Sequence, residues 1–568
     1  MSGRVLLLGL LSAFALAPVC DAARVLSGIR AAKESGISFK VTNFYEDIPP
    51  RGFLPLRVEV GNESGRDGSW EIQSAHAMGD MRTVSYSSRV AVPSGSRKTF
   101  DLLVPLLSQA PGNSGYSNLV ITVTGPGIAS GTAMEYASGR STRSGPYLGM
   151  GSRLGAKNWG LLREALKDAK KPQLSGTQVD PEYLPDDWRA MAGFDVMVFS
   201  ALEWEEIAAD PRRAILDWVA QGGVLVFFAQ AIDVLPPAGP YGAGEILREE
   251  STGDVPAACV RILDESAGRS IDAALAEYSW EWPPAAALGR SVPPQGLIIT
   301  FVLAFAVLIG PVNFMIFAPS GRRHRLIWTT PLISVCATIL MAAGIAVSEG
   351  FGGRGERIVL QWQQPGESRV VRWQEQVSRT GVVISSRFQT GWPALILPIQ
   401  FRVDSRPSGG LWAMDAARYA LNPLPVPEGT WHGDWFRSRS TQGQLLTSVD
   451  TGRERLEFRG SPPVARSSMA SPVEELWFVE ESGSVWFLER LQPGSPATMR
   501  KEDPAAFEAW WAKHLESAGA LITHRANALR AGARGGQYMG LIPGGAISTL
   551  DAIRWGQTPA LLVGNPLP

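Results

Sequence analysis

Two long apolar stretches, 297–318 and 326–347, occupy the middle of the chain. Each contains 22 residues without Asp, Glu, Lys or Arg, and about 20 apolar residues suffice for a helix to cross a hydrocarbon layer of ~30 Å. Only the seven residues 319–325 separate the two stretches. The pattern predicts a transmembrane helical hairpin, so the segments before and after it should fold on the same side of a membrane.

The short connection of the hairpin carries Arg322, Arg323 and Arg325. Because cytoplasmic loops are enriched in Lys and Arg, these residues should set the topology and place the turn in the cytoplasm. We therefore expect a protein of the cytoplasmic (inner) membrane with two spans, whose N- and C-terminal regions are periplasmic. The membrane lipid bilayer is its first expected partner.

Three polar or kinking residues are expected to determine how the hairpin packs. Asn313 could hydrogen-bond to the second helix and fix the register of the pair. Pro311 and Pro331 should kink or begin helices near the turn. A transport element is the alternative, but the two stretches lack the intramembrane charges that an ion pathway uses.

The N-terminus is typical of a secretory signal peptide covering residues 1–22. Arg4 precedes an apolar run at 5–17, and small residues follow up to Ala22, a plausible cleavage point. An uncleaved anchor and lipid attachment at Cys20 are the alternatives.

Composition excludes some classes of function. The formal net charge is −1 and no basic stripe occurs, so we expect no nucleic-acid partner. After signal removal only Cys259 and Cys336 would remain, and Cys336 lies within the second apolar stretch. No intramolecular disulfide is therefore expected.

The region 24–140 has the pattern of a β-sandwich. Leu54, Leu56, Val58 and Val60 alternate with residues of the opposite face, and turn-forming residues follow before the next strand. Several short strands of this kind favour an immunoglobulin-like sandwich. We interpret it as a spacer or packing module.

The region 146–290 alternates strands with helices. An apolar run at 194–199, a helix ending at Gly222-Gly223 and a second apolar run at 224–228 form a βαβ rhythm. Such a rhythm predicts a doubly wound, flavodoxin-like α/β domain.

Two segments of this region, 193–199 and 214–226, resemble the class I glutamine amidotransferase-like fold, especially its non-enzymatic versions in bacterial membrane proteins. Enzymes of that superfamily use a Cys nucleophile on a sharp turn after a strand and a later His. Here Cys259 lies elsewhere, and no histidine occurs between His76 and His324. The resemblance thus implies a degenerate domain, for which we predict no catalytic residue.

Four residues of this domain are weak ligand-binding candidates. Gly149, Gly151 and Ser152 belong to the stretch 149–155, whose spacing is one residue too long for the dinucleotide fingerprint. A tight strand–helix turn is the alternative. Glu203 belongs to an acidic cluster without further ligands at the spacing that a cation site needs. We predict no metal site and no cofactor.

The region after the hairpin is β-rich again. We expect one β-rich domain over 354–460 and a second β-rich lobe over 464–568, divided near Ser461-Pro-Pro463. The second lobe should contain a strand hairpin with a turn at 480–484 and a helix near 503–515.

The segments 310–314 and 328–331, together with the Arg-rich turn, resemble a family of bacterial envelope membrane proteins of unassigned function. These combine a signal peptide, β-rich and degenerate amidotransferase-like parts, and this hairpin. The resemblance implies a non-enzymatic protein that binds a protein or small ligand as a scaffold or accessory subunit of a membrane complex. An ABC-type transporter, or an envelope system with a MoxR-type ATPase and von Willebrand factor A proteins, would be the partner by analogy. The alternatives are a hydrolase or amidotransferase-type enzyme with an unorthodox active site, or a transporter auxiliary component.

Overall fold

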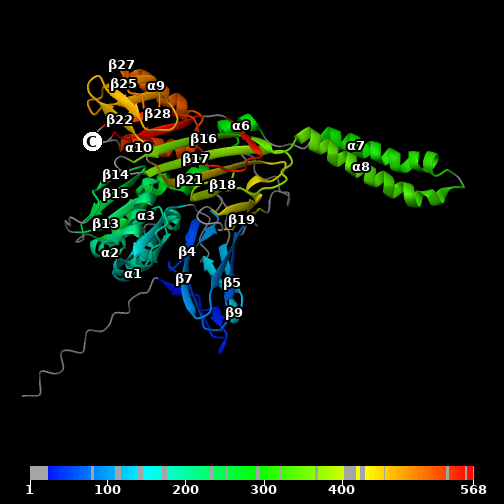
Figure 1. Cartoon of the computed structure of the whole chain (residues 1–568), viewed down its shortest axis with the longest axis horizontal. Coiled ribbons are helices and arrows are strands. Elements are labelled where there is room, and N and C mark those ends of the chain that lie inside the picture. The colour runs from blue at the N-terminus through cyan, green and yellow to red at the C-terminus, as the bar shows by residue number, and fades with distance from the viewer. Residues whose placement is uncertain are drawn as a thin grey trace, which may run out of the picture.

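The computed structural model shows a large sheet-rich body from which two apolar helices project (Figure 1). It describes residues 23–78, 82–108, 117–137, 145–168, 175–229, 235–250, 254–289, 295–319, 321–364, 369–401, 417–422, 429–452, 454–532, 536–556 and 559–566. The predicted signal peptide, 1–22, lies outside these residues. The expectation of a multidomain, sheet-rich chain with two apolar helices is confirmed.

Two antiparallel sheets pack face to face at the N-terminal end of the body. The first has the order β1-β3-β4-β7, with β1 (Arg24–Val25), β3 (Ile37–Asn43), β4 (Gly52–Asn62) and β7 (Ser96–Leu106). The second begins in the order β2-β9-β8-β5-β6, with β2 (Ile29–Ala31), β9 (Ile128–Ala137), β8 (Ser117–Thr124), β5 (Gly68–Met78) and β6 (Thr83–Val92). Leu54, Leu56, Val58 and Val60 of β4 are fully buried, as their alternation predicts.

A six-stranded, mostly parallel sheet follows. Its order is β11-β10-β12-β13-β15-β14, with β10 (Tyr147–Gly151), β11 (Ser175–Val179), β12 (Val196–Ser200), β13 (Val224–Phe228), β14 (Gly239–Tyr241) and β15 (Gly244–Glu249). All neighbouring pairs except β14–β15 are parallel. Counted along the chain, the parallel strands have the order 2-1-3-4-5 of flavodoxin-like sheets.

Helices cover both faces of this sheet. The helices of this part of the chain are α1 (Ser152–Asp168), α2 (Ala201–Glu206), α3 (Ala209–Ala220), α4 (Val255–Ser266), α5 (Ile271–Glu277) and α6 (Pro283–Leu288), with short 3-10 turns η1 (Pro181–Tyr183), η2 (Trp188–Gly193) and η3 (Ala267–Arg269). Leu162 of α1 and Ile262 of α4 pack on one face, against Val198 of β12. Trp204 of α2 packs on the other, edge to face with Phe227 of β13.

A ten-stranded sheet forms the C-terminal part of the body, and a small sheet lies beside it. The large sheet contains β16 (Gly353–Gln363), β17 (Arg369–Thr380), β18 (Ala394–Ile399), β21 (Thr441–Thr451), β24 (Val473–Val479), β25 (Val485–Leu491), β27 (Arg500–Glu502), β28 (Gln537–Ile542), β29 (Ile553–Trp555) and β30 (Ala560–Gly564). The small sheet contains β22 (Leu456–Arg459), β23 (Val464–Ser467) and β26 (Ala497–Thr498). The helices are α9 (Pro504–Leu515), α10 (Ala520–Ala531) and the 3-10 turn η6 (Asp434–Phe436). β24 and β25 form a hairpin and α9 follows, both as the sequence predicts.

Strand pairing crosses the domain divisions that the sequence suggests. β16 pairs in parallel with β30, so the predicted 354–460 domain and the predicted 464–568 lobe share one sheet. The short strands β19 (Arg418–Asn422) and β20 (Thr430–Gly433) extend the second sandwich sheet instead, because β19 pairs with β6. An open strand edge offers unpaired backbone groups to any suitable segment. Local sequence composition does not show which distant segment pairs with such an edge.

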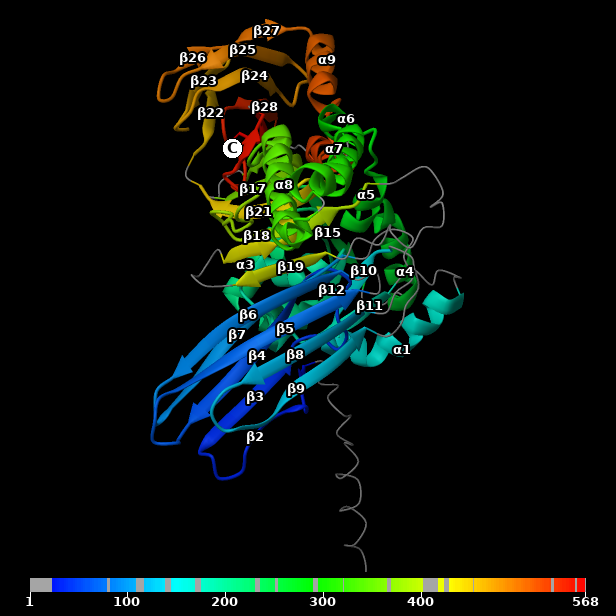
Figure 2. The ribbon, with the colours of Figure 1, turned by 90° about the vertical axis from the view of Figure 1, so that its right-hand side faces the viewer.

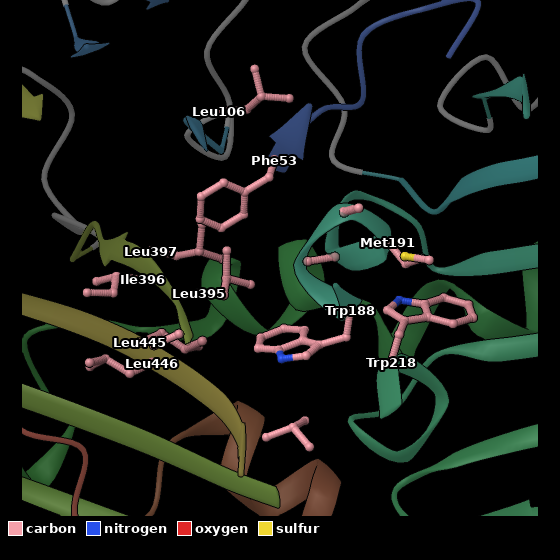
Figure 3. Close-up of a cluster of buried hydrophobic side chains, with 14 of the residues drawn as sticks. Phe53, Leu106, Trp188, Met191, Trp218, Leu395, Ile396, Leu397, Leu445 and Leu446 are labelled. Atoms are coloured by element: carbon pink, nitrogen blue, oxygen red, sulfur yellow. The ribbon is translucent and has the colours of Figure 1, made fainter. Parts of the chain in front are cut away.

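A shared apolar core joins these units. Figure 3 shows Phe53 of β4 and Trp188 of η2 beside Leu395 and Leu397 of β18. Figure 2 shows the sandwich at one end of the body, and β24–β27 with α9 at the other. The α/β unit therefore contacts both β-rich parts.

The projecting helices are α7 (Gln295–Val307), which continues as a π-helix, η4 (Leu308–Phe317), and α8 (Leu326–Glu349), preceded by the 3-10 turn η5 (Arg323–Arg325). Two segments, Ile298–Phe317 and Arg323–Gly344, are long and apolar enough to span a membrane. Only 6% of each apolar window is buried within the protein. An exposed apolar surface of this kind is typical of contact with a membrane or with another protein.

The buried His76 of β5 should make stability depend on pH. Its Nδ1 accepts a hydrogen bond from the Leu107 backbone N–H at 3.0 Å. Burial, aided by the charge of Arg82, lowers the pKa of His76 to about 4. The unfolded chain has an ordinary His pKa of about 6.5 and binds the proton first as pH falls. Folding stability is therefore full above pH ~6.5 and is lost as pH falls toward ~4.

We expect His76 to account for about 2 kcal/mol of stability lost between pH 7.5 and pH 5. Urea unfolding of the full-length protein in detergent, followed by tryptophan fluorescence, measures this loss. His76→Gln keeps an acceptor for Leu107 but does not titrate, so its loss should be smaller by that amount. Equal losses in the two proteins would contradict the assignment.

Candidate functional site

The strand order locates the place where a doubly wound sheet usually binds a ligand. The order reverses between β10 and β12, and ligands of such sheets bind in the crevice at the carboxyl ends of the strands on either side of this point. Gly151 ends β10, Ser152 begins α1, and Ser200 ends β12. The four residues predicted as weak ligand candidates, Gly149, Gly151, Ser152 and Glu203, belong to the segments that meet at this edge of the sheet.

The two glycines are explained by close packing. A Cβ atom on Gly151 would lie 2.3 Å from Oε1 of Glu203, and one on Gly149 would lie 3.1 Å from the Phe194 ring. Gly151 leaves room for a carboxylate of the same chain, and Gly149 for an aromatic side chain. Neither distance requires an external ligand.

The carboxylate of Glu203 lies where β10 and β12 end, against Gly151 and Ser200. The Glu203 side chain is fully buried. Oε1 accepts hydrogen bonds from the backbone N–H groups of Arg153 and Leu154, at 2.8 and 3.2 Å. Oε2 accepts from the backbone N–H and the hydroxyl of Ser200, both at 2.8 Å.

These contacts occupy the position where an anion would otherwise bind. The first N–H groups of a helix lack partners within the helix and attract negative charge. Glu203 satisfies two of them on α1 and forms a capping box with Ser200 at the start of α2. The acidic residue is therefore a cap that joins two helix starts. Among the described residues, no three His, Cys, Asp or Glu side chains gather in a way that could hold a metal ion.

The cysteine of this unit lies away from the crevice. Cys259 is buried in α4, among apolar residues of the opposite helix layer. Burial, with the charge of Glu249, raises the pKa of the Cys259 thiol to about 12. The thiolate needed for nucleophilic attack is disfavoured there.

A buried ionic junction, which sequence reasoning missed, connects the sandwich to the α/β unit. Arg51, at the start of β4, donates to Oδ1 of Asp195 and to Oδ2 of Asp272, both at 2.6 Å. Asp272 also accepts from the Ser108 hydroxyl at 3.0 Å, and Asp195 from the Tyr147 backbone N–H at 2.8 Å. The available signal was an aspartate next to the apolar run 196–199, where a carboxylate needs a partner.

Burial and charge act in opposite directions on the groups of this junction. Burial works against the charged guanidinium, but the two carboxylates raise the pKa of Arg51 above its ordinary value. Burial raises the pKa of Asp272, and Arg51 opposes that effect. Nearby, burial lowers the pKa of Arg525 of α10 to about 10, although Asp195 partly offsets it. A cavity of about 30 Å³ lies between Arg51 and Arg525, which is room for water rather than for a substrate.

The predicted hairpin residues lie near the turn. Asn313 of η4 donates from Nδ2 to the Thr330 hydroxyl of α8 at 3.0 Å, which ties the two helices together. Pro311 lies within the π-helix and Pro331 in the second turn of α8. Arg322, Arg323 and Arg325 are exposed at the tip.

Comparison with known proteins does not identify the chain. No protein-family model matches it, and no curated protein does. Among solved structures, it is similar to Bacteroides uniformis β-glucuronidase 2 bound to cyclophellitol-6-carboxylate aziridine, at 9% identity and a TM-score of 0.16, over 34% of this chain and 33% of that one. A β-glucuronidase from glycoside hydrolase family 2 matches at 14% identity and a TM-score of 0.14, over 35% of this chain and 21% of that one. The chain thus spans a third or less of those enzymes, and TM-scores this low support no conclusion about fold or activity.

The capping role of Glu203 predicts a large loss of stability for a small chemical change. Glu203→Gln replaces one accepting oxygen by an NH₂ group that must face N–H or O–H donors, so we expect about 2–4 kcal/mol of destabilisation. Urea unfolding of the full-length protein in detergent measures it. Glu205→Gln, on the exposed side of the same helix, is the matched control and should change stability by less than about 0.5 kcal/mol. A Glu203→Gln protein as stable as this control would show that the carboxylate is not a structural cap.

Proposed function

We propose that this protein is a non-enzymatic, membrane-anchored envelope protein whose body binds a protein or small ligand and acts as a scaffold or accessory subunit of a membrane complex. The hairpin spans the cytoplasmic membrane twice. Its turn, with three arginines, faces the cytoplasm, and the body lies on the periplasmic side. The body belongs to an amidotransferase-like class of domains that has lost its chemistry.

One observation carries the scaffold proposal: the described residues that precede and follow the hairpin bind the same sheet. Before the first span, the Leu288 carbonyl accepts from Arg379 of β17 at 3.2 Å, and the Gly289 carbonyl accepts from the Thr441 hydroxyl of β21 at 2.9 Å. After the second span, only residues 350–352 separate α8 from β16. Two attachments to one sheet favour a body held in a set orientation, whereas a simple tether would need one flexible link.

The short link after α8 is itself held by backbone hydrogen bonds. The Val382 N–H donates to the Gly350 carbonyl, and the Gly352 N–H donates to the Val382 carbonyl, both at 2.9 Å. Phe351 in this link and Ile384 nearby expose 67% and 87% of their surface. Apolar side chains beside a membrane helix suit contact with the bilayer interface. They support a body that rests against the membrane.

The internal hydrogen bonds of Glu203 support a non-enzymatic role for the α/β unit. Glu203 uses its acceptor oxygens on backbone and hydroxyl donors of the same chain. A partner would then meet the outer surface of the α/β unit, where Leu161 of α1 and Leu202 of α2 are exposed. By analogy with the envelope family that the hairpin resembles, an ABC-type transporter or a MoxR-type ATPase system is the partner class.

Photo-crosslinking in native membranes tests the scaffold proposal. A photoreactive residue at Leu161 or Leu202 should give a discrete cross-linked complex with an envelope protein. The same residue at Arg66, in an exposed sandwich turn, should not.

A flexible insertion distinguishes a rigid scaffold from a flexible tether. Ten Gly and Ser residues inserted both between Gly289 and Arg290 and between Glu349 and Gly350 keep the anchor but release the body, so the cross-link should fall to background. The same insertion between Ser482 and Gly483, in the β24–β25 turn, is the control and should leave the cross-link intact. A cross-link that survives the paired insertions would contradict the rigid scaffold, and the absence of any cross-link would contradict binding at this surface.

A further inference from the structure

A long apolar groove runs between the two projecting helices. Its volume is about 340 Å³, and apolar side chains of α7, η4 and α8 line nearly all of it. Phe301 and Leu340 line one end, and Phe317 and Thr329 line the other. From Thr329 to Leu340 the helix rises by about 16 Å at 1.5 Å per residue. The groove is therefore an apolar slot that runs along the hairpin for about 16 Å.

The sequence explains why the two helices do not close this slot. Ala337 of α8 and Ala304 of α7 line it with small side chains. Near the turn, the first helix widens into the π-helix η4 and is tied to α8 by the bond between Asn313 and Thr330. The helices are thus joined at the tip and leave space along their length.

The tip end of the slot is positively charged. Arg322, Arg323 and Arg325 are exposed there, and the Arg323 guanidinium lies 5.2 Å from the centre of the Phe314 ring. No Asp or Glu occurs between residues 297 and 347, so no carboxylate of the hairpin neutralises these charges. Guanidinium groups bind phosphate oxygens with favourable geometry.

One polar atom of the slot itself has no partner. The Thr329 hydroxyl oxygen is enclosed and makes no hydrogen bond within the part of the chain that the structure describes. It lies at the charged end of the groove, where the ester and phosphate oxygens of a lipid would be. Trp328, 80% exposed beside it, is a side chain typical of the headgroup level of a membrane.

We infer that the hairpin binds one anionic phospholipid. One of its two acyl chains lies in the slot between α7 and α8, and its phosphate meets the arginines of the tip. This inference rests on the proposed membrane position of the hairpin, but not on the proposed scaffold role. A transmembrane helix of another protein would fill the slot without neutralising the arginines, and a neutral lipid would fill it with less charge complementarity. An anionic lipid supplies an acyl chain for the slot, a phosphate for the arginines and an oxygen for the Thr329 hydroxyl.

Native mass spectrometry of the full-length protein in mild detergent tests the inference. The protein is incubated with phosphatidylglycerol or phosphatidylcholine of identical acyl chains, and the retained lipid is counted per chain. We expect one phosphatidylglycerol per chain, preferred over phosphatidylcholine by about fivefold for each arginine, the equivalent of ~1 kcal/mol near a membrane surface. Equal retention of the two lipids would overturn the inference, as would a second polypeptide or a second copy of the chain in place of lipid.

Two variants separate the slot from the charges. Ala337→Phe fills the slot and should abolish retention of both lipids, whereas Ala342→Phe, on an exposed position of the same helix, should retain lipid as the wild type does. The combined change Arg322→Gln, Arg323→Gln and Arg325→Gln should remove the preference for phosphatidylglycerol. Its control is Arg459→Gln, Arg466→Gln and Arg490→Gln, which removes three exposed charges from the body. Variants that behave as their controls would overturn the inference.

Resistance of each protein to carbonate extraction from membranes is measured in parallel. An inserted hairpin without lipid preference would refute the lipid site and leave the membrane position standing. If carbonate extracts the wild-type protein from the membranes, the proposed membrane position is refuted, and with it this inference.

Discussion

Arg51 is the residue on which the arrangement of the body depends. It comes from the sandwich and binds two carboxylates, Asp195 beside β12 and Asp272 in α5. A buried ion pair gains little net stability over an apolar contact of the same shape, but removing one partner costs about 3–5 kcal/mol because a buried charge is left unpaired. The junction therefore specifies how the sandwich sits on the α/β unit. Gly52 follows directly, with a positive φ of 82°, and lets the chain pass close to Gly193 of η2, where a Cβ would lie 2.8 Å from the backbone N.

Two buried glutamates, Glu203 and Glu375, also join separate elements, because each accepts hydrogen bonds from backbone N–H groups at the start of a helix. Glu203 caps α1 from α2. Glu375, in the middle of β17, accepts from the backbone N–H of Ile522 at 2.9 Å and so caps α10, and it also accepts from the Tyr278 hydroxyl at 2.6 Å. Burial raises the pKa of Glu375, and these hydrogen bonds oppose the shift. Each carboxylate joins elements distant in sequence, so the body holds together through polar contacts as well as through its apolar core.

The sequence predicts best what depends on local pattern. The apolar stretches give the hairpin, the alternation from Leu54 to Val60 gives β4, and Asp503 followed by Pro504 gives the start of α9. It predicts poorly what depends on long-range pairing. No local signal brings β19 to the edge of β6, since any open edge would accept a strand of that length. Glu203, a weak ligand candidate in an acidic cluster, stands three residues after Ser200, which is the spacing of a capping box. Its hydrogen bonds to the start of α1 join distant segments and have no local sequence signal. Arg51 lies between Pro50 and Gly52, a context typical of an exposed turn.

Hydrogen exchange of the full-length protein in lipid nanodiscs, comparing wild type with Arg51→Met, tests whether the body is one unit. If Arg51 holds the units together, the Arg51→Met protein should lose protection in η2, α5 and α10 together, although these elements belong to different parts of the chain. Protection in α8 should remain unchanged. Lys40→Met breaks an exposed ion pair with Glu59 and should change exchange only locally. Loss of protection confined to the residues next to Arg51 would contradict the account, because the units would then be held together without the junction.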